Sequence, residues 1–395
     1  MSLTPSPTDA ADASAPTESR AVQIALGTLS VLLVALFYAL CVIRNFDGPI
    51  GDYSESFLYE YLPWFASRHL SFWPIPHLSL HTDEVLYPFG GNVALQSWCV
   101  EREILFALLK SRAPQAPLLQ LYYLFGVALS TLGTYLLLLV RFGSRRAALT
   151  TVIAHALNFY SMQKYAYHYN IACYHWTTLG IVCDFAIVWD VVQRRNVSLR
   201  LVLLRILLLV LAFGLELGHV LGFSLTSFAC TSLYLLWFLY RGSRPNPVSL
   251  RQLLSGWPAE LRSHRVLFGI LALLTICFAW LYGSITAAIV WDSLSMGRFP
   301  GNSGVWWASP LRLLIPYTPW LHPSMQPPFL HVMGDVAETG IGGGSAGLFL
   351  LLLCGIGSVQ VKAYRPRSPY FPLLVMLILY VATSIHLPLL RALPW

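Results

Sequence analysis

The chain has 395 residues, of which 56% are hydrophobic and only 11% are charged. Soluble domains carry about 25% charged residues, so this composition excludes a water-soluble globular fold. The sequence also contains no GxxxxGK[ST] and no HExxH motif, which argues against phosphate-loop enzymes and common zinc proteases.

Residues 1–20 precede the first apolar segment and are rich in Ser, Thr, Pro and Ala. Such a composition buries too little apolar surface to order the chain, so we expect a disordered cytoplasmic tail. The first apolar run spans residues 21–43 and follows acidic residues. A cleavable signal peptide instead has a basic start and about 7–15 apolar residues. Residues 21–395 are therefore expected to form a single transmembrane domain.

A helix needs about 20 mostly apolar residues to cross a bilayer, because lipid offers backbone amides no partner. The sequence predicts an all-α polytopic transmembrane bundle of about nine spans, near 21–43, 118–140, 147–163, 171–192, 201–217, 220–240, 266–290, 346–361 and 371–387. The window 93–111 is also apolar but contains Glu101, Arg102 and Glu103. Each charge costs about 2.5–3.5 kcal/mol at the centre of a membrane helix, so we expect an interfacial or re-entrant helix there.

The charges of the connecting segments predict the orientation, because short cytoplasmic loops are rich in Lys and Arg. With a cytoplasmic N-terminus, the inner segments hold 15 basic and 4 acidic residues, a net charge of +11. The outer segments, counted together with Glu216 at the outer end of the span 201–217, then hold 9 basic and 12 acidic residues, a net charge of −3. The overall charge of +7 is thus explained by attraction to an anionic inner leaflet, and no nucleic-acid partner is predicted.

Two outer segments are long enough to build a site, residues 44–117 and residues 291–345. In the first, Phe57, Tyr61 and Phe65 mark the apolar face of a helical pattern, which predicts an outer-face helix lying along the interface. Asp52 precedes this helix, where a carboxylate can cap free amides. The second segment is rich in Trp, Tyr and Pro. Its aromatic side chains fit either the headgroup belt or a sugar-binding cleft.

The order of these features resembles the GT-C superfamily, membrane glycosyltransferases that take a sugar from a polyprenyl-phosphate donor on the outer face. The resemblance rests on GDYSESFLYEY after the first span, the aromatic helix, YPFG at 87–90, YAYHYNIACYHW, WWASPLRLLIPYTPWLHP and AETGIGGGSAGLFLLLL. It is greatest for a branch of bacterial membrane proteins, which implies a multi-pass protein of the bacterial inner (cytoplasmic) membrane. Relatives usually continue beyond HLPLLRALPW, so we expect a truncated or degenerate form.

The resemblance implies that Asp52 is the catalytic base, with a helix N-cap as the structural alternative. It also implies three partners: membrane lipid, a polyprenyl-phosphate-linked sugar donor, and an outer-face glycan or lipid acceptor. The candidate substrate-binding residues are an acid three positions after Asp52, outer cations suited to phosphate or to ordinary headgroups, two histidines, and the acid of the AETG element. These are Glu55, Arg68, Lys164, His168, His175, Arg298, Arg312 and Glu338.

No cofactor is firmly implied. His168 and His175 would share one face of a continuous helix, which leaves a divalent-metal site open against ordinary hydrogen-bonded packing. The seven cysteines form no CxxC pair and indicate apolar packing, with a Cys99–Cys173 disulfide as the alternative.

Two further functions stay open, because the second outer turn lacks the carboxylate that the family pattern requires. The main alternative is a carrier or flippase for a lipid-linked or polar solute, although we find no internal repeat of the kind common in transporters. The other alternative is a membrane scaffold without catalytic activity. Asp184 lies inside the fourth predicted span, where an acid is costly and by default functional.

Overall fold

The computed structural model describes residues 18–47, 50, 54–84, 90–94, 96, 98–109, 112–113, 116–156, 158, 161–162, 164–165, 169–192, 196–217, 219–241 and 254–295. The predicted tail up to residue 17, the outer segment from residue 296 onward and the last two predicted spans lie outside these residues.

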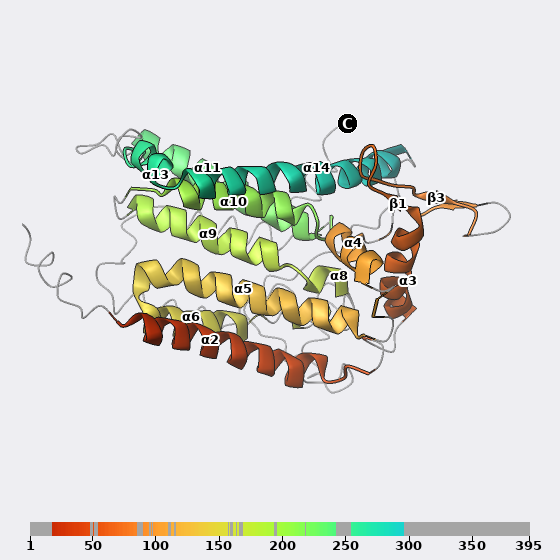
Figure 1. Ribbon diagram of the computed structural model, residues 1–395, viewed down its shortest axis with the longest axis horizontal. Coiled ribbons are helices and arrows are strands. Elements are labelled where there is room, and N and C mark those ends of the chain that lie inside the picture. Colours follow the sequence, from red (N-terminus) through yellow and green to blue (C-terminus); the bar gives the residue numbers. More distant parts are fainter. Residues whose placement is uncertain are drawn as a thin grey trace, which may run out of the picture.

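Long helices lie side by side and form the body of the molecule (Figure 1). They are α2 (Arg20–Phe37), which continues as the π-helix η1 (Tyr38–Ile43), α5 (Leu118–Phe142), α6 (Ser144–Ala156), α9 (His175–Val192), α10 (Leu199–Ala212), α11 (His219–Arg241) and α14 (Arg265–Ser295). Two short helices, α8 (Tyr169–Ala172) and α13 (Trp257–Ser263), precede α9 and α14. α2 contacts α5 and α6, α5 contacts α9, α9 contacts α10 and α11, and α10 contacts α14.

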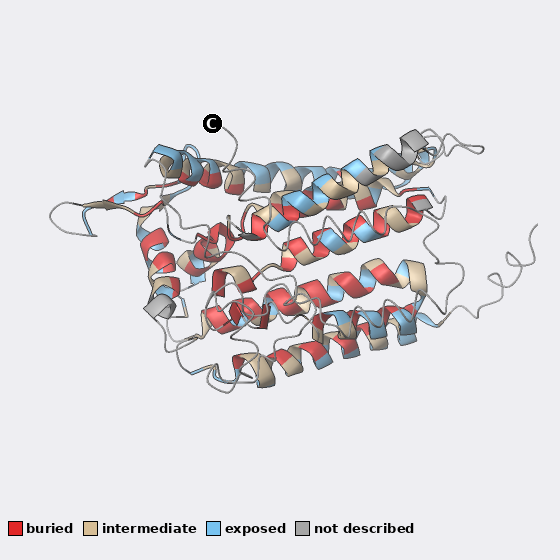
Figure 2. Cartoon of the chain, turned by 180° about the vertical axis from the view of Figure 1, so that it is seen from behind, coloured by how far each residue is buried: buried red, intermediate tan, exposed pale blue. Residues whose placement is uncertain are grey.

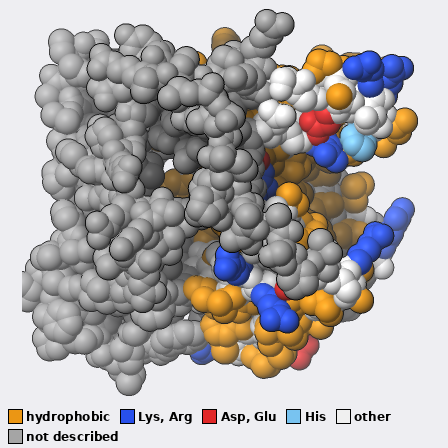
Figure 3. Space-filling view, turned by 90° about the vertical axis from the view of Figure 1, so that its left-hand side faces the viewer, with side chains coloured by type: hydrophobic (Ala, Val, Ile, Leu, Met, Phe, Trp, Pro, Cys, Tyr) orange, Lys and Arg blue, Asp and Glu red, His pale blue; other side chains and the backbone are white. Residues whose placement is uncertain are grey.

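Successive long helices run in opposite directions, so their connections collect at two ends (Figure 1). We name one of them the basic end, after Arg20, Arg141, Arg145, Arg146, Arg200, Arg262 and Arg265. Figure 3 faces this end and shows Lys and Arg side chains next to hydrophobic side chains. These arginines belong to segments that the sequence analysis assigned to the inner side.

Among the described residues, four helical segments are long and apolar enough to cross a bilayer: Arg20–Ile43, Leu118–Phe142, Tyr169–Val191 and Arg265–Ser295. The two outermost helices, α2 and α14, have exposed outward faces (Figure 2). These faces include Leu32 and Leu36 of α2 and Leu273 and Ile276 of α14. Soluble monomers rarely expose such continuous apolar surface, so the helices indicate a membrane protein.

The end opposite the basic end is covered by residues 54–84, 90–94, 96 and 98–109, which we call the cap (Figure 1). The cap contains α3 (Ser54–His69), the strands β1 (Leu70–Ser71) and β2 (His77–Leu78), the strands β3 (His81–Thr82) and β4 (Gly91–Asn92), and α4 (Val100–Leu109). Each strand pair is antiparallel, with Leu70 opposite Leu78 and His81 opposite Asn92. α3 packs on α4 and on α8.

A helix, α3, forms where the apolar pattern after the first span predicted one. Leu62 and Phe65 are buried on one face, whereas Trp64 is exposed on another. The predicted spans at 21–43, 118–140, 220–240 and 266–290 also coincide with helices to within a few residues. These segments are easy to predict because each is a long apolar run with polar residues at its ends.

Three predicted spans differ from the observed helices. α6 ends at Ala156, seven residues before the predicted end at 163. The fourth span is interrupted between α8 and α9. α10 ends at Ala212 because the chain turns there: the Gly214 amide donates to the Leu211 carbonyl at 2.9 Å. The Gly214 carbonyl then accepts the Glu101 amide of the cap at 2.7 Å.

Two glycines allow close helix packing in the body. A Cβ atom at Gly27 of α2 would lie 2.7 Å from the Tyr135 ring of α5, and one at Gly133 of α5 would lie 2.4 Å from Leu179 of α9. Small residues at such positions let membrane helices approach closely. The Tyr135 hydroxyl donates to the Gln23 carbonyl at 2.7 Å, so this approach also ties α2 to α5.

At the basic end, two carboxylates from other segments cap helix N-termini. Glu18 accepts the Ser144 amide of α6 at 3.2 Å. Glu260 of α13 accepts the Leu199 amide of α10 at 2.7 Å and the Ser198 hydroxyl at 2.5 Å. Both contacts place a negative charge at the positive end of a helix, where free amides need acceptors.

Candidate functional site

Only three of the predicted site residues have described side chains, namely Arg68, Lys164 and His175. Arg68 lies on the surface of the cap, whereas Lys164 and His175 are buried in the body. Glu55 lies in the first turn of α3, but its side chain is outside the described set. The others, Asp52, His168, Arg298, Arg312 and Glu338, lie outside the described residues.

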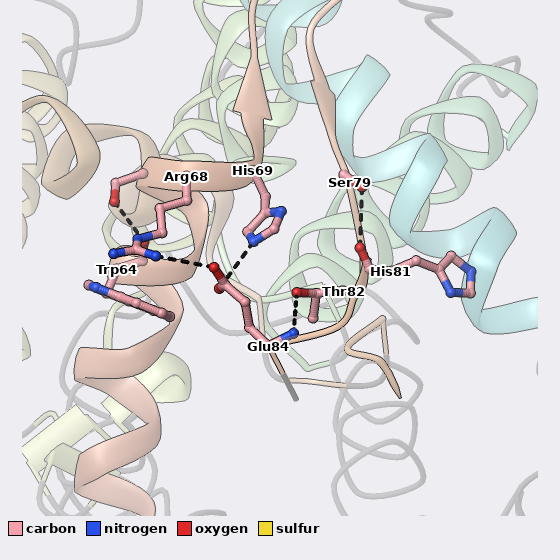
Figure 4. Close-up of polar contacts among 8 residues, drawn as sticks. Trp64, Arg68, His69, Ser79, His81, Thr82 and Glu84 are labelled. Carbon is pink, nitrogen blue, oxygen red and sulfur yellow. Dashed lines mark hydrogen bonds and ion pairs between the residues drawn. The ribbon is translucent and has the colours of Figure 1, made fainter. Parts of the chain in front are cut away.

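Arg68 belongs to an exposed polar cluster on the cap (Figure 4). Its guanidinium lies 3.1 Å from the Glu84 carboxylate and 4.4 Å from the centre of the Trp64 ring. His69 Nε2 lies 3.4 Å from the other oxygen of Glu84. The Glu84 amide donates to the Thr82 hydroxyl at 3.0 Å, which holds the backbone of Glu84 beside the end of β3.

The pKa of Glu84 is lowered from its ordinary value, chiefly by the hydrogen bond from His69 and further by Arg68. The cluster therefore holds an ionised carboxylate beside a cation at neutral pH. Exposed ion pairs contribute about 0–1 kcal/mol to the free energy of unfolding. Arg68 can therefore leave Glu84 and bind an outside ligand at little cost. An arginine in this setting can bind a phosphate through two parallel hydrogen bonds.

A second group of charges is buried inside the cap, in α4. Arg102 is 0% exposed and Glu103 is 2% exposed. The Arg102 guanidinium donates to both oxygens of Glu103 and to the side-chain oxygen of Asn170 in α8. It also lies 5.8 Å from the centre of the Tyr59 ring and 5.6 Å from that of Tyr169.

The adjacent acid of α4, Glu101, turns toward α9. One of its oxygens lies 3.2 Å from His175 Nε2 and accepts the Tyr122 hydroxyl at 3.4 Å. The other accepts the Trp176 indole N–H. His175, predicted to bind substrate or metal, therefore holds a cap carboxylate. α4 is attached to α5 through Tyr122, to α8 through Asn170 and to α9 through His175 and Trp176.

These contacts concern the window 93–111, for which the sequence predicted an interfacial or re-entrant helix that does not cross the bilayer. α4 has 10 residues, too few to cross a bilayer, but all three of its charged side chains are buried. Burial raises the pKa of Glu103. Burial lowers the pKa of Arg102, but the Glu103 carboxylate outweighs this effect and the net pKa is raised. Charges remain in such a place only when paired and hydrogen-bonded, as they are here.

A small polar cavity of about 20 Å³ lies directly behind His175, between α5, α6 and α9. Its lining includes His155, Asn158, Ser161 and Cys173. A cavity of this size holds about one water molecule, so it is too small for a sugar or a lipid headgroup. Asn158 accepts hydrogen bonds from Tyr174 and from the Ser161 amide, which occupies much of its polar capacity.

Asp184 and Arg205 form a buried ion pair inside the body. Arg205 Nε donates to one Asp184 oxygen at 2.7 Å and Nη2 donates to the other at 2.9 Å. The Ser227 hydroxyl donates to the same carboxylate at 2.7 Å. Asp184, whose burial inside a span was expected to be costly, thus joins α9, α10 and α11. These contacts give Asp184 a structural role.

The remaining predictions concern metal and disulfide sites. Among the described residues, no group of three or more His, Cys, Asp or Glu side chains is placed to hold a metal ion. His175 starts α9 after the break that follows α8, so the continuous helix that would align it with position 168 is absent from this segment. Cys99 and Cys173 are both buried free thiols, so the alternative of a disulfide is wrong.

Sequence reasoning missed the α4 network. Glu101 meets its partners His175 and Trp176 across 74 and 75 residues of chain. The available signal was the run of three charges in an apolar window, together with His and Trp at the start of a later span.

In comparisons with family models, with curated proteins and with solved structures, no match to this chain was found.

Proposed function

We propose that this protein is a membrane glycosyltransferase of the GT-C type, with about nine spans, a cytoplasmic N-terminus and its site at the cap end. One observation supports this proposal above the others. The segment that follows the first apolar helix folds into a cap over one end of the bundle, and the exposed cluster of Arg68, His69 and Glu84 lies on this cap. In the sequence, Asp52 lies two residues before Ser54, where α3 begins.

In the proposed reaction, the acceptor hydroxyl gives its proton to Asp52 while its oxygen forms a bond to the anomeric carbon of the sugar. The bond from that carbon to the phosphate oxygen breaks, and the polyprenyl phosphate leaves with the electron pair. A general base accelerates such a step by about 10²–10⁴-fold. Arg68 would bind the phosphate, and the buried contacts of Arg102 and Glu101 would hold α4 and α3 rigidly beneath it.

The test is Asp52→Asn, assayed as sugar incorporation by membranes supplied with a polyprenyl-phosphate-linked sugar. Asn caps a helix about as well as Asp, so the protein should insert and fold while activity falls by about 10²–10⁴. Glu60→Gln is the matched control, because it removes an exposed carboxylate from the same helix. Full activity in Asp52→Asn would exclude this residue as the base.

The carrier or flippase alternative has one observation in its favour, the ionisable residues buried between the long helices. Intramembrane charges often mark the pathway of a transported solute. Reconstituted vesicles separate the two functions, since a carrier moves a lipid-linked sugar between leaflets without incorporating it into an acceptor. A scaffold would do neither.

A further inference from the structure

The turn between β1 and β2 exposes a set of large apolar side chains. Trp73 is 83% exposed, Ile75 is 59% exposed and Phe72 is 42% exposed. Residues 70–76 read LSFWPIP and contain no charged side chain. Soluble surfaces rarely gather three such residues on one tight turn, so this turn marks a contact with an apolar partner.

The base of this hairpin packs against the last third of α14. Leu78 of β2 shares a buried cluster with Ile285 and Ile289 of α14. Ser293 of α14 donates to the Ala94 carbonyl at 3.3 Å, which ties the same helix to the segment after β4. Figure 1 shows the turn beside the end of α14. The hairpin is thus attached to a helix whose other side is exposed and apolar.

The length of α14 places this attachment at the membrane surface. Its 31 residues span about 46 Å at about 1.5 Å per residue, whereas the hydrocarbon core is about 30 Å thick. Arg265 begins the helix at the basic end. About ten residues at the other end, including the exposed Trp291 and Leu294, therefore reach the interfacial region. Trp is enriched at this level because its ring is apolar and its N–H is polar.

We propose that the turn of residues 72–76 is an interfacial anchor, which inserts Phe72, Trp73 and Ile75 into the leaflet at the cap end. The partner is the boundary between phospholipid headgroups and acyl chains. Two observations select lipid over a protein partner: the hairpin is attached to the end of α14 that reaches the interfacial region, and the turn contains no charge to pair with a partner. The anchor would hold the cap at a fixed depth, beside the surface from which a lipid substrate arrives. The proposal stands whether or not the chain is an enzyme.

The experiment places an environment-sensitive NBD fluorophore on Trp73→Cys, in protein whose reactive native cysteines are replaced. The control is Asp83→Cys, an exposed position near the end of β3. Both proteins are reconstituted into phosphatidylcholine vesicles with 25% phosphatidylglycerol, with or without 5-doxyl phosphatidylcholine. We expect doxyl lipid to quench the label at 73 at least threefold more than the label at 83, and iodide to quench it less. Ile75→Cys repeats the measurement if Trp73→Cys fails to fold.

Equal quenching at 73 and 83, with full access to iodide, would overturn the proposal because the turn would lie in water. A label at 73 that is shielded from both iodide and doxyl lipid would also overturn it. Energy transfer between labelled copies would then identify a second copy of the chain as the partner. Undiminished doxyl quenching after Phe72→Ser and Ile75→Ser would show that insertion does not depend on the turn, and would likewise contradict the anchor.

Discussion

Removing the positive charge of Arg102, which is buried inside the cap, should destabilise the protein far more than removing a charge from the cap's surface. Arg102→Met keeps an unbranched apolar stem but takes away the partner of the buried Glu103 carboxylate. Breaking a buried pair from one side costs about 3–5 kcal/mol. At about 2 °C per kcal/mol, the unfolding midpoint should fall by about 6–10 °C. Cys99 is buried and free, so reaction of such buried thiols with a fluorogenic dye reports the transition.

Arg68→Met is the matched control, because Arg68 also pairs with a carboxylate but is exposed. Arg68→Met should lower the free energy of unfolding by less than about 1 kcal/mol. Adding Glu103→Leu to Arg102→Met should restore at least half of the lost stability, since replacing both buried charges is often neutral. If Arg102→Met unfolds within 1 °C of the Arg68→Met control, the buried network does not hold the cap and this reasoning is refuted.

Three other predictions follow from the same contacts. Asp184→Ala should cost about 3–5 kcal/mol in thermal unfolding because its arginine partner stays buried, and a cost under 1 kcal/mol would count against the ion pair. The pKa of Glu84 is lowered by His69, so its contribution to stability is complete above the ordinary value of 4.5 and disappears as pH falls through the lower folded value. Side-chain carbon NMR measures that titration, and a midpoint at or above 4.5 would contradict it. Impermeant thiol reagents should modify Asp83→Cys but not Arg146→Cys in intact cells, and the reverse pattern would invert the proposed orientation.

The sequence predicted the long helices well and their polar partners poorly. α5 and α14 follow from apolar runs that only a membrane helix satisfies, so local composition is enough. The burial of Glu101 depends on His175 and Trp176, which come from a different helix far along the chain. A periodic pattern predicts the face of a helix but not which residues pack on it, so the sequence did not predict the burial of the three charges in the window 93–111. Asp52, the predicted base, lies outside the described residues.

The hydrogen bond between Glu260 and the N-terminus of α10 also determines when α10 can complete its contacts during synthesis. The carboxylate and the Leu199 amide are 61 residues apart, and a ribosome takes about 3–12 s to add that length at about 5–20 residues per second. Asp184 has already been made when Arg205 emerges, so the nascent helix can find its partner on α9 at once. The hydrogen bond at the N-terminus of α10 can form only after α13, which contains Glu260, has been made. The short helix α10 is therefore secured in two steps, first at its middle and seconds later at its start.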